Sequence, residues 1–365
     1  MGPEDRTPAS VSPATRATPN IVPAEIWSRL VEPSTLNVGD QPPATPIAAE
    51  AERATRVLHA REQAQFALPS SPRVITVSNQ KGGVGKTTTA VNVAVALALH
   101  GARVLVIDSD PQGNASTALG IEHAVGTRSI YDVLIGNSSL AEVVVAHESV
   151  PGLRCAPATI DLAGAEIELV SLVARETRLR KAIVAYLGAA PDDLPHYVLI
   201  DCPPSLGLLT VNALVAADEV LIPIQCEYYA LEGLGQLLSS IEMIRAHLNE
   251  GLAVSTILLT MYDARTRLSD QVADEVRRHF GPLVLDSVVP RSVRVSEAPG
   301  YGQSVLTYDP GSRGAMSYLE AARELAERGR AAPHPPPPTS SGSTESRQPI
   351  VEPAEDEERA ERGVT

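Results

Sequence analysis

The sequence predicts an α/β fold, a doubly wound and mostly parallel sheet with helices on both faces. Three observations predict it. Short apolar runs alternate with longer helical patterns, a glycine-rich loop follows the first run, and aspartates end two others. Strands that alternate with helices form parallel sheets, which bind ligands beyond the carboxyl ends of their strands. The motifs described below all fall at such positions.

Two proline-rich segments flank this alternating region. Of the 30 prolines in the 365-residue chain, 18 lie in residues 1–72 and 331–365. Stretches such as His334–Pro338 and Glu355–Glu358 have little apolar content and cannot offset their chain entropy by burial, so we expect both segments to be disordered. Within the first, Ala48–Glu62 has helix formers at helical spacing, and we favour a transient helix in a linker over a stable one. Residues 73–330 are expected to form one domain.

The elements of this domain are expected from apolar pattern and length. The expected strands are the short buried runs Val74–Val77, Val104–Ile107, Tyr197–Ile200, Val220–Ile224, Val254–Leu259 and Val284–Val288. The expected helices are the longer periodic segments Lys86–His100, Gly164–Leu187, Leu208–Ala216, Leu231–Leu248, Ser269–Phe280 and Arg313–Arg328.

Charge and cysteine content exclude several classes of protein. The formal charge of −14 leaves −8 for residues 73–330, which argues against nucleic-acid binding by overall charge but not against a local basic patch. Cys155, Cys202 and Cys226 lie far apart and form no CxxC pair, which indicates neither a disulfide framework nor a zinc site. No apolar run reaches the roughly 18 residues of a membrane span, and no signal peptide is evident. We expect a soluble, cytoplasmic protein.

A phosphate-binding loop is the clearest motif. The run Ser78–Thr88 (SNQKGGVGKTT) lies between a predicted strand and a predicted helix, the context that such a loop requires. Its glycines let backbone amides wrap phosphate oxygens, Lys86 can reach the terminal phosphates, and the Thr87 hydroxyl can ligate Mg²⁺. The strict GxxxxGK[ST] pattern fails because Gln80 occupies its first glycine position. An additional lysine, Lys81, precedes the glycines.

The run KGGVGKTTT resembles the deviant Walker A loop of the ParA and MinD group of ATPases. The resemblance implies a P-loop NTPase fold, with ATP contacted by Lys81, Gly82, Gly83, Val84, Gly85, Lys86, Thr87 and Thr88. In that group the added lysine, here Lys81, reaches across a nucleotide-sandwich homodimer, so dimerisation depends on ATP. A cation supplied in trans would neutralise charge on the transferring phosphoryl group. The alternative is that Lys81 is a solvated loop lysine.

Aspartates stand at the ends of two predicted strands. VLVIDSDPQGN carries Asp108 and Asp110, and YVLIDCPPS carries Asp201. The resemblance assigns Asp110 to positioning the attacking water and Asp108 to a supporting place near the metal. Asp201 stands where a Walker B carboxylate holds Mg²⁺ through water. Taken alone, the first two would form a polar turn and the third would cap a helix.

Two later segments, Leu258–Val272 and Val288–Ala322, resemble the chromosomal ParA branch of this group. The similarity covers about residues 73–328. It implies that Pro290 and Ser292 contact the adenosine part of the nucleotide, although many relatives have asparagine where Ser292 stands.

The same resemblance implies a DNA-binding surface. Arg265 and Arg294 match basic positions through which relatives grip the DNA backbone without sequence preference, and a dimer would double this cluster. The alternative is that both are solvated surface arginines paired with nearby carboxylates such as Asp263 and Glu297.

The expected function is an ATP-driven switch that partitions DNA. The ATP-bound dimer would coat nucleoid DNA, and a ParB-like centromere-binding partner would stimulate a slow hydrolysis and cause release. The resemblance favours a chromosome as cargo, because the chain lacks the folded N-terminal DNA-reading domain of many plasmid relatives. A MinD-like membrane ATPase is disfavoured by the proline-rich, acidic residues 331–365, and an iron–sulfur reductase by the lack of cysteines. A nucleotide-gated polar scaffold without DNA binding stays open as an alternative.

Overall fold

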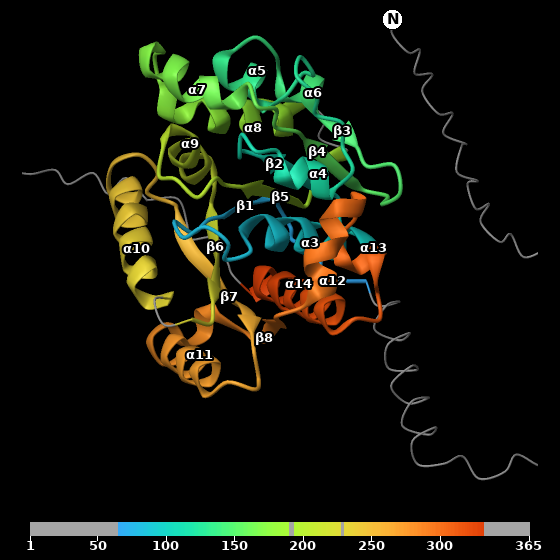
Figure 1. Ribbon diagram of the computed structural model, residues 1–365. Coiled ribbons are helices and arrows are strands. Elements are labelled where there is room, and N and C mark those ends of the chain that lie inside the picture. Colours follow the sequence, from blue (N-terminus) through green and yellow to red (C-terminus); the bar gives the residue numbers. More distant parts are fainter. Residues whose placement is uncertain (1–64, 190–192, 228–229, 332–365) are drawn as a thin grey trace, which may run out of the picture. The chain divides into compact units, whose positions relative to one another are not determined.

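The strands that the structure describes form one eight-stranded sheet (Figure 1). The computed structural model describes residues 65–189, 193–227 and 230–331. The strands are β1 (Arg73–Val77), β2 (Val104–Asp108), β3 (Val145–Ala146), β4 (Leu153–Ala156), β5 (Tyr197–Asp201), β6 (Glu219–Gln225), β7 (Ala253–Tyr262) and β8 (Val284–Pro290). Their order in the sheet is β3-β4-β2-β5-β1-β6-β7-β8. All neighbours run parallel except β3, which is antiparallel to β4.

Helices cover both faces of this sheet (Figure 1). They are α3 (Lys86–Leu99), α4 (Asn114–Ala118), α5 (Ile130–Ile135), α6 (Leu140–Val143), α7 (Leu162–Glu168), α8 (Arg178–Ala189), α9 (Leu208–Ala216), α10 (Ala230–His247), α11 (Arg267–Phe280), α12 (Val293–Glu297), α13 (Val305–Tyr308) and α14 (Arg313–Ala331). The predicted disordered segments, and the helix considered at Ala48–Glu62, lie outside the described residues except for 65–72 and Ala331.

Alternate side chains of the central strands supply two separate cores. β2 and β5 are buried along their whole length, as expected for parallel strands between two helical layers. Leu105 and Ile200 pack into one core with residues of α5, α7, α8, α9, α10 and α11. Val106 and Leu199 point to the other side, into a core with residues of α3, α4, α13 and α14. The predicted doubly wound α/β fold is confirmed.

The centre of the sheet sets the position of the site. β1 lies between β5 and β6, with Val77 in register with Asp201. β2 lies on the other side of β5, and Asp108 is also in register with Asp201. The carboxyl ends of three neighbouring strands therefore bring the loop after β1 beside two aspartates that are far apart in the sequence.

One predicted helix is wrong. The segment Gly164–Leu187 is not continuous, because α7 ends at Glu168 and α8 begins at Arg178. Between them Ala174 has a φ of 54°, a left-handed conformation that a helix cannot contain. The buried Asn212 of α9 forms hydrogen bonds with backbone groups at the break. It donates to the Arg175 carbonyl at 2.8 Å and accepts from the Leu179 N–H at 3.2 Å. This tertiary contact replaces helical hydrogen bonds.

The remaining differences are additions to the prediction. The six predicted strands and the other five helices are present. Leu208–Ala216 has the predicted bounds and the rest are shifted at one or both ends, whereas β3, β4 and several short helices were not predicted. Packing also begins before the predicted boundary at residue 73. Phe66 is buried and stacks on His100 with 4.2 Å between ring centroids, so part of the N-terminal extension belongs to the core of α3 and α14.

Candidate functional site

The loop between β1 and α3 has the backbone of a phosphate cradle. Gly83 and Gly85 have φ angles of 75° and 88°, a region that L side chains rarely adopt, so these glycines are required by the turn. Gly85 is the N-cap of α3, and the loop amides therefore lie at the positive end of a 14-residue helix. The chain forms an anion-binding site at the position that the sequence predicts.

Neighbouring strands hold this loop in place. Asn79 donates to the Pro223 carbonyl of β6 at 2.8 Å and accepts from the Lys81 N–H at 3.0 Å. Thr260 of β7 donates to the Val84 carbonyl at 2.9 Å. Both ends of the glycine run are thus fixed to the sheet, which preorganises the backbone amides for a phosphate group.

The two lysines of the loop lie in different environments. Lys86 is buried and donates from Nζ to the Lys81 carbonyl at 3.1 Å, inside the loop. Burial lowers the pKa of Lys86, against the opposing effect of Asp201. The Lys81 side chain is 34% exposed, and its Nζ pairs with Glu227 Oε2 at 3.3 Å. Lys86 is therefore placed to act within its own loop, and Lys81 lies at the surface beside it.

The ends of β2 and β5 bring together the predicted acidic residues. Asp108 is fully buried, and its carboxylate accepts from Ser116 N at 2.8 Å, from Ser116 Oγ at 2.7 Å and from Asp110 N at 3.2 Å. Burial raises the pKa of Asp108 to about 6, although the bonds from Ser116 act in the opposite direction. Asp110 is also buried and accepts from Gln112 N at 3.0 Å.

Asp201 differs from these neighbours because its carboxylate has no hydrogen bond of normal geometry among the described residues. It is fully buried, and burial together with the charge of Asp108 raises its pKa well above the usual range. Thr87 comes near enough to lower this pKa partly, without forming such a bond. A buried carboxylate without partners is costly unless a cation satisfies it.

These residues fit a magnesium ion with a nucleotide. The unpartnered oxygens of Asp201 and the hydroxyl of Thr87 supply hard oxygen donors, and Mg²⁺ keeps several waters while using one or two protein ligands. The oxygens of Asp108 are engaged by Ser116 and Asp110, which suits a supporting place near a metal rather than direct ligation.

The cysteines take no part in this chemistry. Cys155, Cys202 and Cys226 are buried and unpaired by disulfides. Cys202 follows Asp201 directly, and burial raises the pKa of its thiol well above the usual range. A thiol that resists ionisation is a poor metal ligand and nucleophile, so Cys202 is a small core residue, as predicted.

Pro290 and Ser292 lie at the carboxyl end of β8, on the same edge of the sheet as the loop. Pro290 is in register with Tyr262 at the end of β7, and Ser292 is the N-cap residue of α12. Between them, Arg291 reaches Glu227, the partner of Lys81, with 3.4 Å between Nη2 and Oε1. Glu227 therefore connects the segment after β8 to the phosphate loop through Arg291 and Lys81. The sequence analysis did not single out Glu227 or Arg291.

The two arginines expected to bind DNA are exposed and already paired within the chain. Arg265, 87% exposed, binds both oxygens of Asp263 at 2.9 and 2.8 Å. Arg294, 56% exposed, pairs with Glu297 at 3.1 Å and with Asp309 at 3.3 Å. Exposed pairs of this kind contribute little to stability and exchange readily with other anions.

Fold and site together define a P-loop ATPase with a second lysine in its phosphate loop. A family model described as an AAA domain matches residues 72–254. The sporulation initiation inhibitor protein Soj of Bacillus subtilis is 51% identical over 257 residues, which are 70% of this chain and 99% of Soj. The chromosome partitioning protein ParA of Caulobacter vibrioides is 53% identical over 258 residues, 71% of this chain and 95% of that protein. The chain belongs to the ParA/Soj family of chromosome partitioning ATPases.

A solved structure supports the fold and the nucleotide site. The cobyrinic acid a,c-diamide synthase of Mycobacterium smegmatis with bound ADP and magnesium is 35% identical, with a TM-score of 0.62 over 72% of this chain and 98% of that one. Nucleotide and magnesium therefore bind to this fold. Among the described residues, no helix combines the length and apolar character needed to cross a membrane.

Proposed function

We propose that this ATPase is a switch that partitions chromosomal DNA. Its ATP-bound form is a sandwich homodimer that binds DNA without sequence preference, and a ParB-like partner stimulates its slow hydrolysis and releases it. The contrast between buried Lys86 and surface Lys81 carries the proposal. One lysine serves the nucleotide of its own chain, and the other is available to a second chain. Soj and ParA, named for chromosome partitioning or sporulation control, support this cellular role.

The roles of the site residues follow from their surroundings. Gly82, Gly83, Val84 and Gly85 would supply loop backbone around the phosphates of ATP, and Thr88 would contribute from the first turn of α3. Pro290 and Ser292, at the carboxyl end of β8, would contact the adenosine part. Lys86 neutralises phosphate charge, Thr87 and Asp201 hold Mg²⁺, and Asp108 supports them. Asp110, two residues beyond the end of β2 at Asp108, positions the attacking water. Held by these residues, Mg²⁺ would supply positive charge at the phosphate oxygens.

Lys81 completes the chemistry from the second chain. Its amine would leave Glu227 and meet the phosphates of the partner's ATP, adding positive charge where the transition state needs it. Hydrolysis then removes the anion that this lysine binds. The dimer therefore forms while the terminal phosphate is present, and it dissociates after hydrolysis has removed that phosphate.

The ion pairs of Arg265 and Arg294 favour the second candidate function, a nucleotide-gated scaffold without DNA binding. Asp263, Glu297 and Asp309 already neutralise these cations. For DNA binding, phosphates must displace these carboxylates, and the doubled charge of a dimer makes the exchange favourable. The two functions therefore differ in whether DNA binds at all.

Binding to non-specific duplex DNA separates them. Fluorescence anisotropy is measured with ATP, ADP and no nucleotide, each at low and high salt, for the wild type and for Arg294→Glu. The switch predicts binding with ATP alone that weakens with salt and is lost in the variant. Arg323→Glu, at a surface arginine of α14 paired with Glu320, is the matched control and should bind as the wild type does. Absence of binding in every nucleotide state would overturn the switch in favour of the scaffold.

A further inference from the structure

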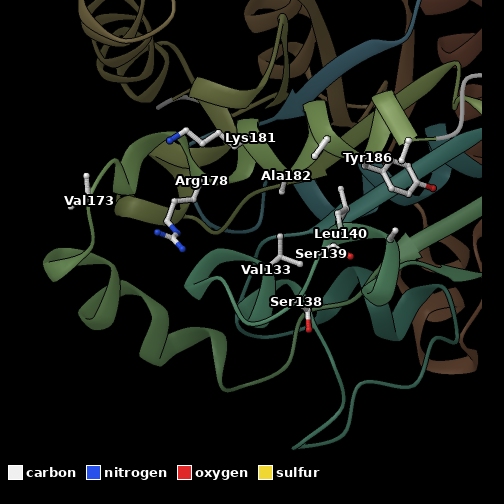
Figure 2. A pocket seen from close by; sticks show the side chains of 12 residues that line it. Val133, Ser138, Ser139, Leu140, Val173, Arg178, Lys181, Ala182 and Tyr186 are labelled. Carbon is white, nitrogen blue, oxygen red and sulfur yellow. The ribbon is translucent and has the colours of Figure 1, made fainter.

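A groove of about 460 Å³ lies between α5, α6 and α8, and none of its lining residues belongs to the phosphate loop (Figure 2). Val133 and Leu140 face Ala182 across it. Figure 2 shows Arg178 and Lys181 toward one end, near Val173, and Tyr186 toward the other. The groove therefore combines an apolar floor with a cationic end.

The chemistry of this lining selects the kind of ligand. No carboxylate lines the groove, and neither Arg178 nor Lys181 has an ion pair among the described residues. Arg178 donates to the Leu134 carbonyl, which fixes its side chain at the edge of the groove. Val173, which also lines the groove, is 89% exposed and adds apolar surface near the cationic end. An acidic segment with a few apolar side chains would complement this surface.

We propose that the acidic C-terminal segment of this chain, residues 350–362, docks in this groove. It begins with Ile350 and Val351, and residues 352–361 hold six carboxylates against one arginine. Its carboxylates match Arg178 and Lys181, and its apolar residues match the floor formed by Val133 and Leu140. The other candidate segment, residues 48–62, has three carboxylates and three arginines and offers no such complement.

A long tether joins the acidic segment to the last helix. α14 ends at Ala331, and residues 332–349 connect it to the acidic segment. A chain of that length, with the proline run 335–338, spans up to about 60 Å at ~3.1–3.6 Å per residue. A tethered segment has an effective concentration of roughly millimolar, so even a weak complementary contact is populated. This inference depends on no part of the proposed function.

Zero-length cross-linking of the full chain tests the proposal. A carbodiimide joins an amine to a carboxylate only where the two are in contact, and mass spectrometry then identifies the peptides. We expect a link between Lys181 and the carboxylates of residues 352–361 within one molecule, shown by the absence of mixed products in an equal mixture of ¹⁴N- and ¹⁵N-labelled protein. Hydrogen exchange of residues 133–142 and 178–189 provides a second measurement that needs no reactive amine.

Variants test whether charge pairing between the groove and the tail causes the docking. Lys181→Arg should lose the link but keep the slow exchange, because the charge remains. Reversing the tail by Glu355→Lys, Glu357→Lys and Glu358→Lys should speed exchange in the groove about tenfold, whereas Arg180→Gln, on α8 but outside the lining, should change neither measurement. The proposal is overturned if Lys181 gives no link to the tail, if the links join only different molecules, or if tail reversal leaves exchange unchanged.

Discussion

Lys81 and Glu227 form an ion pair across the loop, with 3.3 Å between Nζ and Oε2. The other oxygen of Glu227 meets Arg291 at 3.4 Å and accepts a hydrogen bond from Gln225. Glu227 thus holds the surface lysine of the phosphate loop within its own chain. A lysine that acts on a partner's nucleotide has to exchange this carboxylate for phosphate.

Replacing Glu227→Gln should make the ATP-dependent dimer easier to form. Exposed pairs contribute about 0.2–1 kcal/mol, so releasing Lys81 should lower the protein concentration at which half is dimeric by roughly 1.4- to fivefold. Sedimentation equilibrium with a non-hydrolysable ATP analogue measures this. Glu242→Gln, which removes the pair with Arg245 on α10, is the control. An unchanged or raised concentration would show that Glu227 does not compete with the dimer.

The two loop lysines should fail in different ways. Lys86→Ala removes the buried cation at the phosphates and should weaken nucleotide binding at least about tenfold, as expected for a charge-assisted contact of ~1.5–3 kcal/mol. Lys81→Ala should leave ATP binding by the monomer within about twofold, while the dimer and its hydrolysis are lost. Calorimetric titration and sedimentation separate the two effects. Equal losses of nucleotide binding in both variants would contradict a trans role for Lys81.

Asp201→Asn should stabilise the protein without nucleotide while abolishing magnesium-dependent hydrolysis. The pKa of Asp201 is raised in the folded protein, so the folded state binds its proton more tightly than the unfolded chain does. The wild type should therefore lose stability as pH rises, by up to ~1.4 kcal/mol per unit where only the folded state holds the proton. Between about pH 5 and 8, the Asp201→Asn variant should lose less stability than the wild type. Thermal unfolding at both pH values checks this, and equal slopes for the two proteins would exclude it.

Ser116→Ala should destabilise the fold through Asp108. The substitution removes the hydroxyl that donates to Asp108 Oδ2 at 2.7 Å and accepts from Ala158 N at 3.2 Å. Leaving buried groups unsatisfied costs about 1–3 kcal/mol. The melting temperature should fall by roughly 3–10 °C. Ser239→Ala, at an exposed serine that bonds only within α10, should shift it by less than about 1 °C.

The sequence was sufficient to predict the central strands of the sheet and the phosphate loop. Apolar runs identify β1, β2 and β5 because strands buried on both faces need continuous apolar residues, and β5 is buried throughout. The break between α7 and α8 was missed because apolar spacing continues across it. The side chain that stabilises the break, Asn212, comes from α9, so the apolar pattern of residues 164–187 does not reveal it.

The same limit applies to the site. Lys81, Lys86 and Asp201 stand at strand ends or in the loop, where local context identifies them. Glu227 matters through its contact with Lys81, which is distant in sequence. Nothing in the neighbourhood of Glu227 predicts this contact, because the order of strands in the sheet creates it. Ser116 lies only eight residues after Asp108, and it reaches that carboxylate because the chain turns from β2 into α4.

The central place of β1 has a consequence for the growing chain. Arg73 pairs with Tyr197 on one side, and Ile75 pairs with Glu219 on the other. Contacts between such distant segments form late because long loops must close first. During synthesis, the strand that carries the phosphate loop waits for β5 and β6 to leave the ribosome. A nascent chain that has not yet exposed β6 should therefore be unable to capture nucleotide, although every residue of its phosphate loop has long been made.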